Sequence, residues 1–240
     1  MSNMLSTSTR TYGRRQGRPI KSSKQLLIEE LLPVIAIDLA ESEHRINPHI
    51  YFDREAPVWM EIGFGGGEHL VQLAVNHPDI NFIGCEPFLN GVASLLESVH
   101  KHALTNIRIF QGNALDLLKT FQHGCLSRLY LMFADPWPKK RHHKRRFVQE
   151  AILDSVMPIL KVGAQFRLAT DHADYQQWIL THLRKRSDLQ EVLCTFEKPK
   201  SWPMTRYESK AIHEGRKALY MIYKYKASET DCDRTSTERL

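Results

Sequence analysis

Glu61-Ile62-Gly63-Phe64-Gly65-Gly66-Gly67 is the stretch that decides the fold of this chain. It overlaps an apolar run at Val58–Ile62, which predicts a buried strand, and it opens a helical pattern that continues to about His77. Glycines between a strand and a helix allow a tight turn and let a ligand approach the backbone closely. The stretch therefore predicts the first strand–helix unit of an α/β fold that binds a small ligand.

Strand–helix units continue along the chain after the glycine turn. Predicted strands cover Asn81–Cys85, Asn106–Gln111, Leu129–Ala134, Gln165–Ala169, Val192–Phe196 and Ala218–Tyr225. Predicted helices cover Leu89–Ala103, Ala114–Phe121, about Arg145–Leu160 with Gly163 closing it, and Asp174–Arg186. This alternation predicts an α/β fold with a mostly parallel, doubly wound sheet. Residues 197–217 are interpreted as a polar loop, which allows the last strand to run antiparallel.

The two ends of the chain differ in composition from its middle. Residues 1–24 are predicted to be a flexible basic arm, and residues 227–240 a disordered polar tail. Residues 25–226 are predicted to form a single domain, which begins with apolar residues at helical spacing that Pro33 interrupts. The basic residues of the arm are Arg10, Arg14, Arg15, Arg18, Lys21 and Lys24, and no acid precedes Glu29.

The composition fits a globular domain with a polyanionic partner. Of the 240 residues, 42% are apolar, and the formal net charge is +6. This apolar fraction supports a buried core, and the positive charge favours a partner such as nucleic acid. No run of 18 apolar residues occurs, so we expect no membrane span.

Cysteine and histidine positions bear on the compartment and on metals. Cys85, Cys125, Cys194 and Cys232 lack the paired spacing of a zinc site, and no HExxH motif occurs. We therefore expect a cytoplasmic protein with reduced thiols and no metal site. The start of the chain lacks the apolar core of a secretion signal. Its acid-poor composition leaves an organellar transit peptide open, although an apolar stripe at helical spacing is missing.

Acids near the glycine turn indicate which ligand it binds. Glu86 follows the second predicted strand about 20 residues later, where a carboxylate can bind the ribose of NAD or of S-adenosylmethionine. A dinucleotide site needs a third glycine at the position of Glu68, whose charge would repel a pyrophosphate. Asn113, after the third strand, can hydrogen-bond an adenine edge, cap the next helix, or do both. Because Glu61 suits a cationic amino group and a sulfonium, S-adenosylmethionine is favoured over NAD.

Asp135-Pro136-Trp137-Pro138 follows the predicted strand Leu129–Ala134. Ligands of open α/β sheets bind at the carboxyl ends of the strands, which is where Asp135 is expected. Trp137 can stack on a base or pack under the loop, and the eight residues Lys139–Arg146 are all basic or histidine. An acid, an aromatic ring and a cationic run in so short a segment indicate chemistry on a nucleobase.

With these motifs, the chain resembles the tRNA (guanine-N7)-methyltransferases of the bacterial TrmB type. The resemblance extends from about Gly13 to Tyr225 and includes the segments Arg14–Arg18, Thr170–His172 and Thr205–Glu208. It implies a Rossmann-like, S-adenosylmethionine-dependent methyltransferase fold. It also implies transfer of a methyl group from S-adenosylmethionine to N7 of the variable-loop guanine, position 46 in standard tRNA numbering.

The resemblance also implies roles for individual residues. Cofactor contacts fall on Glu61, Gly63, Gly65, Glu86, Asn113 and Asp135, although some members carry Asp at the position of Asn113. Substrate contacts fall on Lys139, Asp171, Thr205, Arg206, Tyr207 and Glu208. RNA contacts fall on Arg141, His142, His143, Lys144, Arg145 and Arg146. The catalytic position is Asp135.

Several of these positions have a second interpretation. Asp135 can bind the cofactor's amino group or order its loop instead of acting on the base. Asp171 can cap the following helix, and Thr205 and Glu208 can belong to an ordinary inter-strand loop. Part of Lys139–Arg146 can form the first turn of the next helix.

Two other function classes remain open at this stage. An amino-group methyltransferase would have proline followed by an aromatic residue where this chain has Trp137 and Pro138, so the match is poor. A non-catalytic RNA-binding protein would avoid acids at three strand ends, because they repel a polyanion. We expect tRNA as the partner and a monomer or weak homodimer as the oligomeric state.

Overall fold

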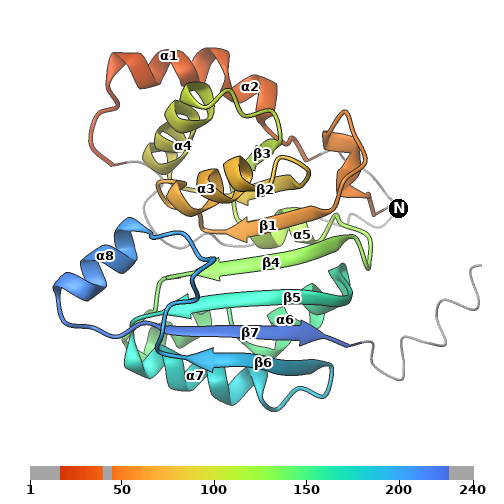
Figure 1. Cartoon of the computed structure of the whole chain (residues 1–240), viewed down its shortest axis with the longest axis vertical. Helices are drawn as coiled ribbons and strands as arrows, with labels where there is room; N and C mark the ends of the chain where they lie inside the picture. Colours follow the sequence, from red (N-terminus) through yellow and green to blue (C-terminus); the bar gives the residue numbers. More distant parts are fainter. Residues whose placement is uncertain (1–16, 40–44, 227–240) are drawn as a thin grey trace, which may run out of the picture.

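A computed structural model describes residues 17–39 and 45–226 of the chain. In this part of the chain, seven strands form one sheet with the order β3-β2-β1-β4-β5-β7-β6 (Figure 1). The strands are β1 (Val58–Ile62), β2 (Asn81–Cys85), β3 (Ile107–Phe110), β4 (Leu126–Met132), β5 (Leu160–Thr170), β6 (Leu189–Thr195) and β7 (Leu219–Tyr225). The bounds predicted for β1 and β2 are confirmed to the residue.

The sheet is parallel except at its last strand. β1 pairs in parallel with β2 and β4, β2 with β3, and β4 with β5. β7 lies between β5 and β6 and runs antiparallel to both. The mostly parallel sheet with an antiparallel last strand is therefore confirmed.

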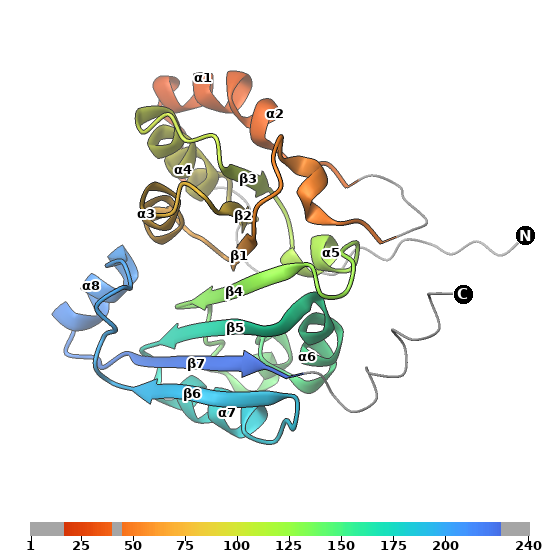
Figure 2. The same cartoon turned by 45° about the vertical axis from the view of Figure 1, so that its right-hand side comes forward.

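Helices cover both faces of the sheet (Figures 1 and 2). On one face, apolar side chains of α5 (Ala114–Leu118), α6 (Glu150–Val156) and α7 (Ala173–Leu183) share a buried cluster with β-strand residues such as Phe166. On the other face, α1 (Ser22–Glu30), α2 (Leu32–Ile35), α3 (Glu68–Asn76) and α4 (Leu89–Lys101) contribute to a second cluster around Trp59 and Phe82. This two-sided cover explains why β1 and β2 are buried at every position.

The strand order places the ligand-binding edge of the sheet. The chain moves outward from β1 to β3 in one direction and then returns to β4 on the other side of β1. At such a reversal the connections on the two sides leave the sheet in opposite directions, and a crevice opens at the carboxyl ends of the strands. The loops after β1, β2, β3 and β4 therefore meet at one edge.

The segment between β6 and β7 differs from its prediction. Residues 197–217 contain the helix α8 (Arg206–His213), whereas the sequence was interpreted as a polar loop there. Thr205 begins the helix with a capping box, in which its side chain accepts a bond from the Glu208 N–H and the Glu208 carboxylate accepts one from the Thr205 N–H. Figure 1 shows α8 beyond the carboxyl ends of β4 and β5.

The segment after β4 also differs from its prediction. The single helix predicted near 145–160 is replaced by the 3-10 helix η2 (Lys140–Arg145), α6, and the short 3-10 helix η3 (Met157–Ile159). η2 is separated from α6, so it is not the first turn of that helix. Gly163 lies inside β5 with a positive φ of 86°, and its predicted role as the helix end was wrong.

The start of the described chain lies against α4. The Gly17 N–H donates to Asn90 Oδ1 at 2.7 Å, and the Lys24 ammonium lies 3.0 Å from Glu97. Since α1 begins at Ser22, the last residues of the predicted arm are helical. The remainder of that arm, residues 1–16, and the predicted tail, residues 227–240, lie outside the described residues. Within the described ranges, no helix is long and apolar enough to cross a membrane.

Candidate active site

The glycine turn between β1 and α3 is shaped by three residues with positive φ. Gly63, Gly65 and Gly67 have φ values of 69°, 57° and 82°, which residues other than glycine rarely adopt. Glu86 fixes the turn, because its carboxylate accepts bonds from the Gly65 N–H at 2.8 Å and the Phe88 N–H at 2.9 Å. Glu86 was predicted only as a ribose contact, so its bonds to the glycine turn are a structural role that the sequence reasoning did not foresee.

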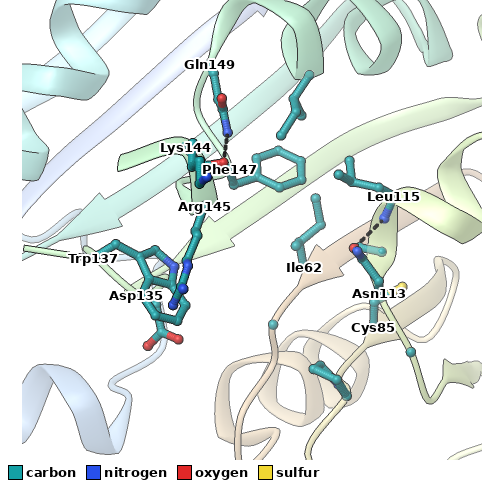
Figure 3. Close-up of a pocket in the computed structure, with 15 residues that line it drawn as sticks. Ile62, Cys85, Asn113, Leu115, Asp135, Trp137, Lys144, Arg145, Phe147 and Gln149 are labelled. Atoms are coloured by element: carbon teal, nitrogen blue, oxygen red, sulfur yellow. Dashed lines mark hydrogen bonds between the residues drawn. The ribbon is translucent and has the colours of Figure 1, made fainter. Parts of the chain in front are cut away.

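A cavity of about 330 Å³ opens at the carboxyl ends of the first four strands (Figure 3). Its apolar wall contains Ile62, Ala114, Leu115, Phe147 and Ile152. Its polar wall contains Asn113, Asp135, Lys144, Arg145 and Gln149. Figure 3 shows Asp135, Trp137 and Arg145 grouped on one side, across from Ile62, Asn113 and Leu115. The size and the mixed lining are typical of a small-molecule site.

Asp135 stands at the mouth of this cavity. Its carboxylate is open to solvent, but enough protein surrounds it that desolvation raises the pKa of the carboxyl group. Nearby, Phe133 and Trp137 have φ values of 50° and 45°. Trp137 lines the cavity and makes a T-shaped contact with His142 at 5.9 Å, while the Arg145 guanidinium lies 4.8 Å from its ring centroid. Trp137 therefore packs within its own loop and also borders the cavity.

Asn113 and Glu86 combine structural contacts with positions beside the cavity. Asn113 caps α5, accepting from the Leu115 N–H at 3.1 Å, and it also lines the cavity. Glu86 is buried, and desolvation raises its pKa, although the bonds from Phe88 and Gly65 oppose this shift. An ionised carboxylate has about four acceptor sites. Two accepted backbone bonds therefore leave acceptor capacity for ligand hydroxyls.

Glu61 forms a buried pair with a residue that the sequence reasoning missed. Glu61 and His69 are each 2% exposed, and the carboxylate lies 2.8 Å from His69 Nδ1. Both line a small second cavity together with Gly63, Thr205 and other residues, and Gly63 also lines the larger cavity. Glu61 is in β1 and His69 is in the first turn of α3, so the pair lies beside the glycine turn that joins these elements. A local signal existed, since His69 is only two residues after Gly67 and eight after Glu61.

The predicted substrate group at Thr205–Glu208 has mixed exposure. Thr205 and Glu208 are buried by the capping box, and Glu208 also accepts from the Tyr220 hydroxyl and pairs with Lys198 at 3.1 Å. Tyr207 is half-exposed and lies against the glycine turn, because a Cβ at Gly65 would come within 3.0 Å of its ring. Arg206 is exposed, 3.6 Å from Glu68.

The predicted contact Asp171 pairs with Arg216 at 2.6 Å. Its alternative role as a helix cap was wrong, because His172 caps α7 and accepts from the Tyr175 N–H.

The basic segment Lys139–Arg146 divides into an outer and an inner part. Lys139, Arg141 and Lys144 are exposed, and Lys144 and Arg145 line the cavity. Arg146 is fully buried, which contradicts its predicted place on an RNA-binding surface. The cavity walls also include Phe147, Gln149 and Ile152, which were missed because their residue types carry no signal beyond an ordinary helix.

The donor and acceptor groups of this site fit S-adenosylmethionine. A Cβ built at Gly63 meets nothing within 4 Å, so the turn leaves open space for a ligand. The apolar wall near Asn113 suits a base, and the acids Glu61 and Asp135 suit an ammonium or a sulfonium. Glu86 lines neither cavity but lies between Cys85 and Pro87, which line the larger one, and its carboxylate suits ribose hydroxyls. In the described ranges, no group of three or more histidine, cysteine or acidic side chains is arranged to hold a metal ion.

Solved structures share the fold at low sequence identity. The 16S rRNA methyltransferase KamB aligns with a TM-score of 0.53 and 13% identity, covering 73% of this chain and 89% of its own. An rRNA methylase from Streptococcus thermophilus aligns with a TM-score of 0.51 and 9% identity, and the alignment covers 88% of this chain and 98% of the methylase. These likenesses confirm a Rossmann-like methyltransferase fold.

Sequence relatives are closer. The tRNA (guanine-N(7)-)-methyltransferase of Paramagnetospirillum magneticum is 40% identical over 230 residues, which is 94% of this chain and 96% of the relative. The protein of the same name from Bradyrhizobium diazoefficiens is 42% identical over 217 residues, or 89% and 92%. A sequence family described as "Putative methyltransferase" matches residues 55–221. Similarity at this level over nearly the full length of both chains means that the chain belongs to the tRNA (guanine-N7-)-methyltransferase family.

Proposed function

We propose that this protein transfers the methyl group of S-adenosylmethionine to N7 of a guanine in tRNA, at position 46 of the variable loop. The observation that carries the proposal is Asp135. Its carboxylate stands at the mouth of a cavity bounded by the glycine turn, next to the exposed cations of the basic segment. The names of the relatives support N7 of a tRNA guanine as the methylated atom, without specifying its position in the tRNA.

Guanine N7 has an exposed lone pair and no proton, so the reaction at this atom needs no general base. S-adenosylmethionine, when bound, supplies an electrophilic methyl group on a sulfonium sulfur. The protein must align the two reactants and exclude water, and alignment alone can lower a barrier by about 7–11 kcal/mol. Rigid loops at the cavity, such as the one fixed by Glu86, are suited to this task.

Asp135 contributes an electrostatic effect that grows during the reaction. Positive charge appears on the guanine ring as its N7 becomes methylated, and a nearby carboxylate stabilises this charge more in the transition state than in the ground state. The same carboxylate can accept hydrogen bonds from the guanine N1–H and exocyclic amine. Its partial desolvation strengthens both interactions, because charges interact more strongly in a less polar environment.

The cofactor would be held by the turn and the three strand-end residues around it. Glu61 and the backbone at Gly63 and Gly65 would hold the methionine end, Glu86 the ribose hydroxyls, and Asn113 the base. The pair between His69 and Glu61 orients that carboxylate within the core.

The tRNA would lie across the outer part of the basic segment. Lys139, Arg141 and Lys144 are exposed, and such side chains position an RNA through its phosphates without reading its sequence. Arg145 lies between this surface and the cavity. His142 and His143 are partly exposed in η2, where they can contact the same RNA. Asp171 and the Arg206–Tyr207 edge of α8 are the remaining candidate contacts to the substrate. A tRNA substrate is consistent with a cytoplasmic location of the protein.

The test is a methylation assay with labelled S-adenosylmethionine and unmodified tRNA transcript. The expected product is 7-methylguanosine, located at position 46 by nucleoside analysis and by strand cleavage at the modified base. A matched transcript with adenine at position 46 should remain unlabelled. Label in another nucleoside, or equal labelling of the two transcripts, would refute the proposal.

A further inference from the structure

Arg146 ends the run of basic residues, yet its environment differs from that of its neighbours. It is the largest fully buried side chain in the described part of the chain. Arginine is almost never fully buried unless its charge is paired. A buried guanidinium at the end of an RNA-binding surface therefore calls for a role inside the protein.

The guanidinium of Arg146 has partners from two segments. Its Nε–H donates to the carbonyl oxygen of Pro136 at 2.8 Å, and its Nη2 donates to the carboxylate of Asp174 on α7. The group also lies over the rings of Trp178 and Tyr175, 4.8 Å and 5.2 Å from their centroids. Arg146 thus joins the loop after β4 to the first turns of α7.

The loop that receives this bond has an unfavourable backbone conformation. Trp137 has a φ of 45°, which costs on the order of 1–3 kcal/mol for such a residue. A conformation of this kind persists only when surrounding contacts hold it in place. The Pro136 carbonyl belongs to the peptide group that joins Pro136 to Trp137, so Arg146 holds the strained position directly. Asp135 is the residue immediately before this peptide.

We propose that Arg146 is a positioning residue for methyl transfer: it holds the Pro136–Trp137 peptide so that Asp135 stays at the mouth of the cavity. Its charge is paired with Asp174 instead of an RNA phosphate, and its Nη1 is buried without a hydrogen-bond partner. The inference rests on the proposed function, because its main measurement is the rate of tRNA methylation.

Arg145 provides a matched comparison, since it carries the same charge one position earlier. Arg145 is part of the proposed RNA and cavity surface, whereas Arg146 is fully buried. Arg145→Gln and Arg146→Gln each remove one positive charge. The two variants should therefore differ in kcat, KM and salt dependence only if the two arginines have different functions.

The experiment measures kcat and KM for tRNA at saturating S-adenosylmethionine, and the tRNA dissociation constant as a function of salt. Arg145→Gln should raise KM and lower the salt slope of binding by about 1, as expected for a lost phosphate contact. Arg146→Gln should leave KM and the salt slope unchanged and lower kcat by roughly 10- to 100-fold, the scale of a misplaced catalytic group. Equal changes of the salt slope in the two variants, with kcat preserved in Arg146→Gln, would overturn the positioning role.

Two further variants keep the test informative if Arg146→Gln does not fold. Arg146→Lys retains the charge but lacks the planar group that reaches Pro136 and Asp174 together, so kcat should still fall. Asp174→Asn changes a side chain that is 57% exposed and should lower kcat several-fold without weakening tRNA binding. A wild-type kcat in either folded variant would refute the inference. Absence of 7-methylguanosine with the wild-type protein would instead refute the proposed function.

Discussion

Replacing Gly91 with alanine should displace the glycine turn, although Gly91 lies in a different element of the chain. Gly91 lies in the first turn of α4, and a Cβ built there overlaps the carbonyl oxygen of Gly65 and lies 3.1 Å from its carbonyl carbon. A carbon atom and a carbonyl oxygen pack no closer than about 3.3 Å, so the overlap with the oxygen requires the backbones to separate by about 1 Å. Neither element moves easily, because Glu86 holds the turn at 2.8 Å and α4 is packed through buried residues such as Leu95.

The expected cost follows from three contributions. Overpacking a tight contact costs about 1–3 kcal/mol, and alanine in a helix returns about 1 kcal/mol at most. Weakening the charge-assisted bond from Gly65 to Glu86 adds about 1–2 kcal/mol. The free energy of unfolding should therefore fall by about 1–4 kcal/mol, which lowers the Tm by roughly 2–16 °C in a protein of this size. The affinity for S-adenosylmethionine should fall about tenfold or more, since the displaced turn borders the cavity.

Thermal unfolding and calorimetric titration with S-adenosylmethionine measure the two effects. Ser98→Ala is the control, because Ser98 lies on the same helix and its hydroxyl makes only a long bond of 3.4 Å to the Ser94 carbonyl. That variant should stay within about 0.5 kcal/mol of wild type. If Gly91→Ala melts at or above the wild-type temperature and binds S-adenosylmethionine normally, the close approach of α4 to the turn is wrong.

Three further predictions concern the proposed catalytic carboxylate, a helix cap and the core. Because burial raises the pKa of Asp135, its carboxylate is protonated at a higher pH than usual, so single-turnover rates should decline as pH falls through that raised value. Asp135→Asn should lower the rate roughly 10²-fold and lose this acid limb, and an unchanged limb would assign it to another group. Thr205→Ala removes the cap of α8 and should cost about 1–2 kcal/mol in a thermal melt, whereas a wild-type Tm would show that the cap is dispensable. Phe166→Ala opens a cavity in a fully buried position of β5 and should cost about 3–5 kcal/mol in urea unfolding; a loss below about 1 kcal/mol would contradict the packing described here.

Much of the fold could be predicted because its signals are local. The bounds of β1 and β2 follow from apolar runs that end at glycine or at an acid, and the alternation with helices implies parallel strands. The α8 helix was missed although Thr205 and Glu208 have the spacing of a capping box, because few apolar residues follow them. The role of Gly163 was misjudged because a glycine after a helical pattern can equally close the helix or lie in a strand.

The groups near the candidate site could be predicted without a structure: acids at the ends of strands, a glycine turn, and cations after β4. Those are properties of residue types and of their distance from a predicted strand end. The packing of distant segments set the burial of the two adjacent arginines: Arg146 is fully buried, whereas Arg145 is partly exposed and lines the cavity. The partners of Arg146 are a carbonyl ten residues away and a carboxylate 28 residues away, and a sequence pattern does not encode contacts between such distant segments. Burial depends on how the loop, α7 and the basic segment pack together, which is why two identical neighbouring side chains lie in different environments.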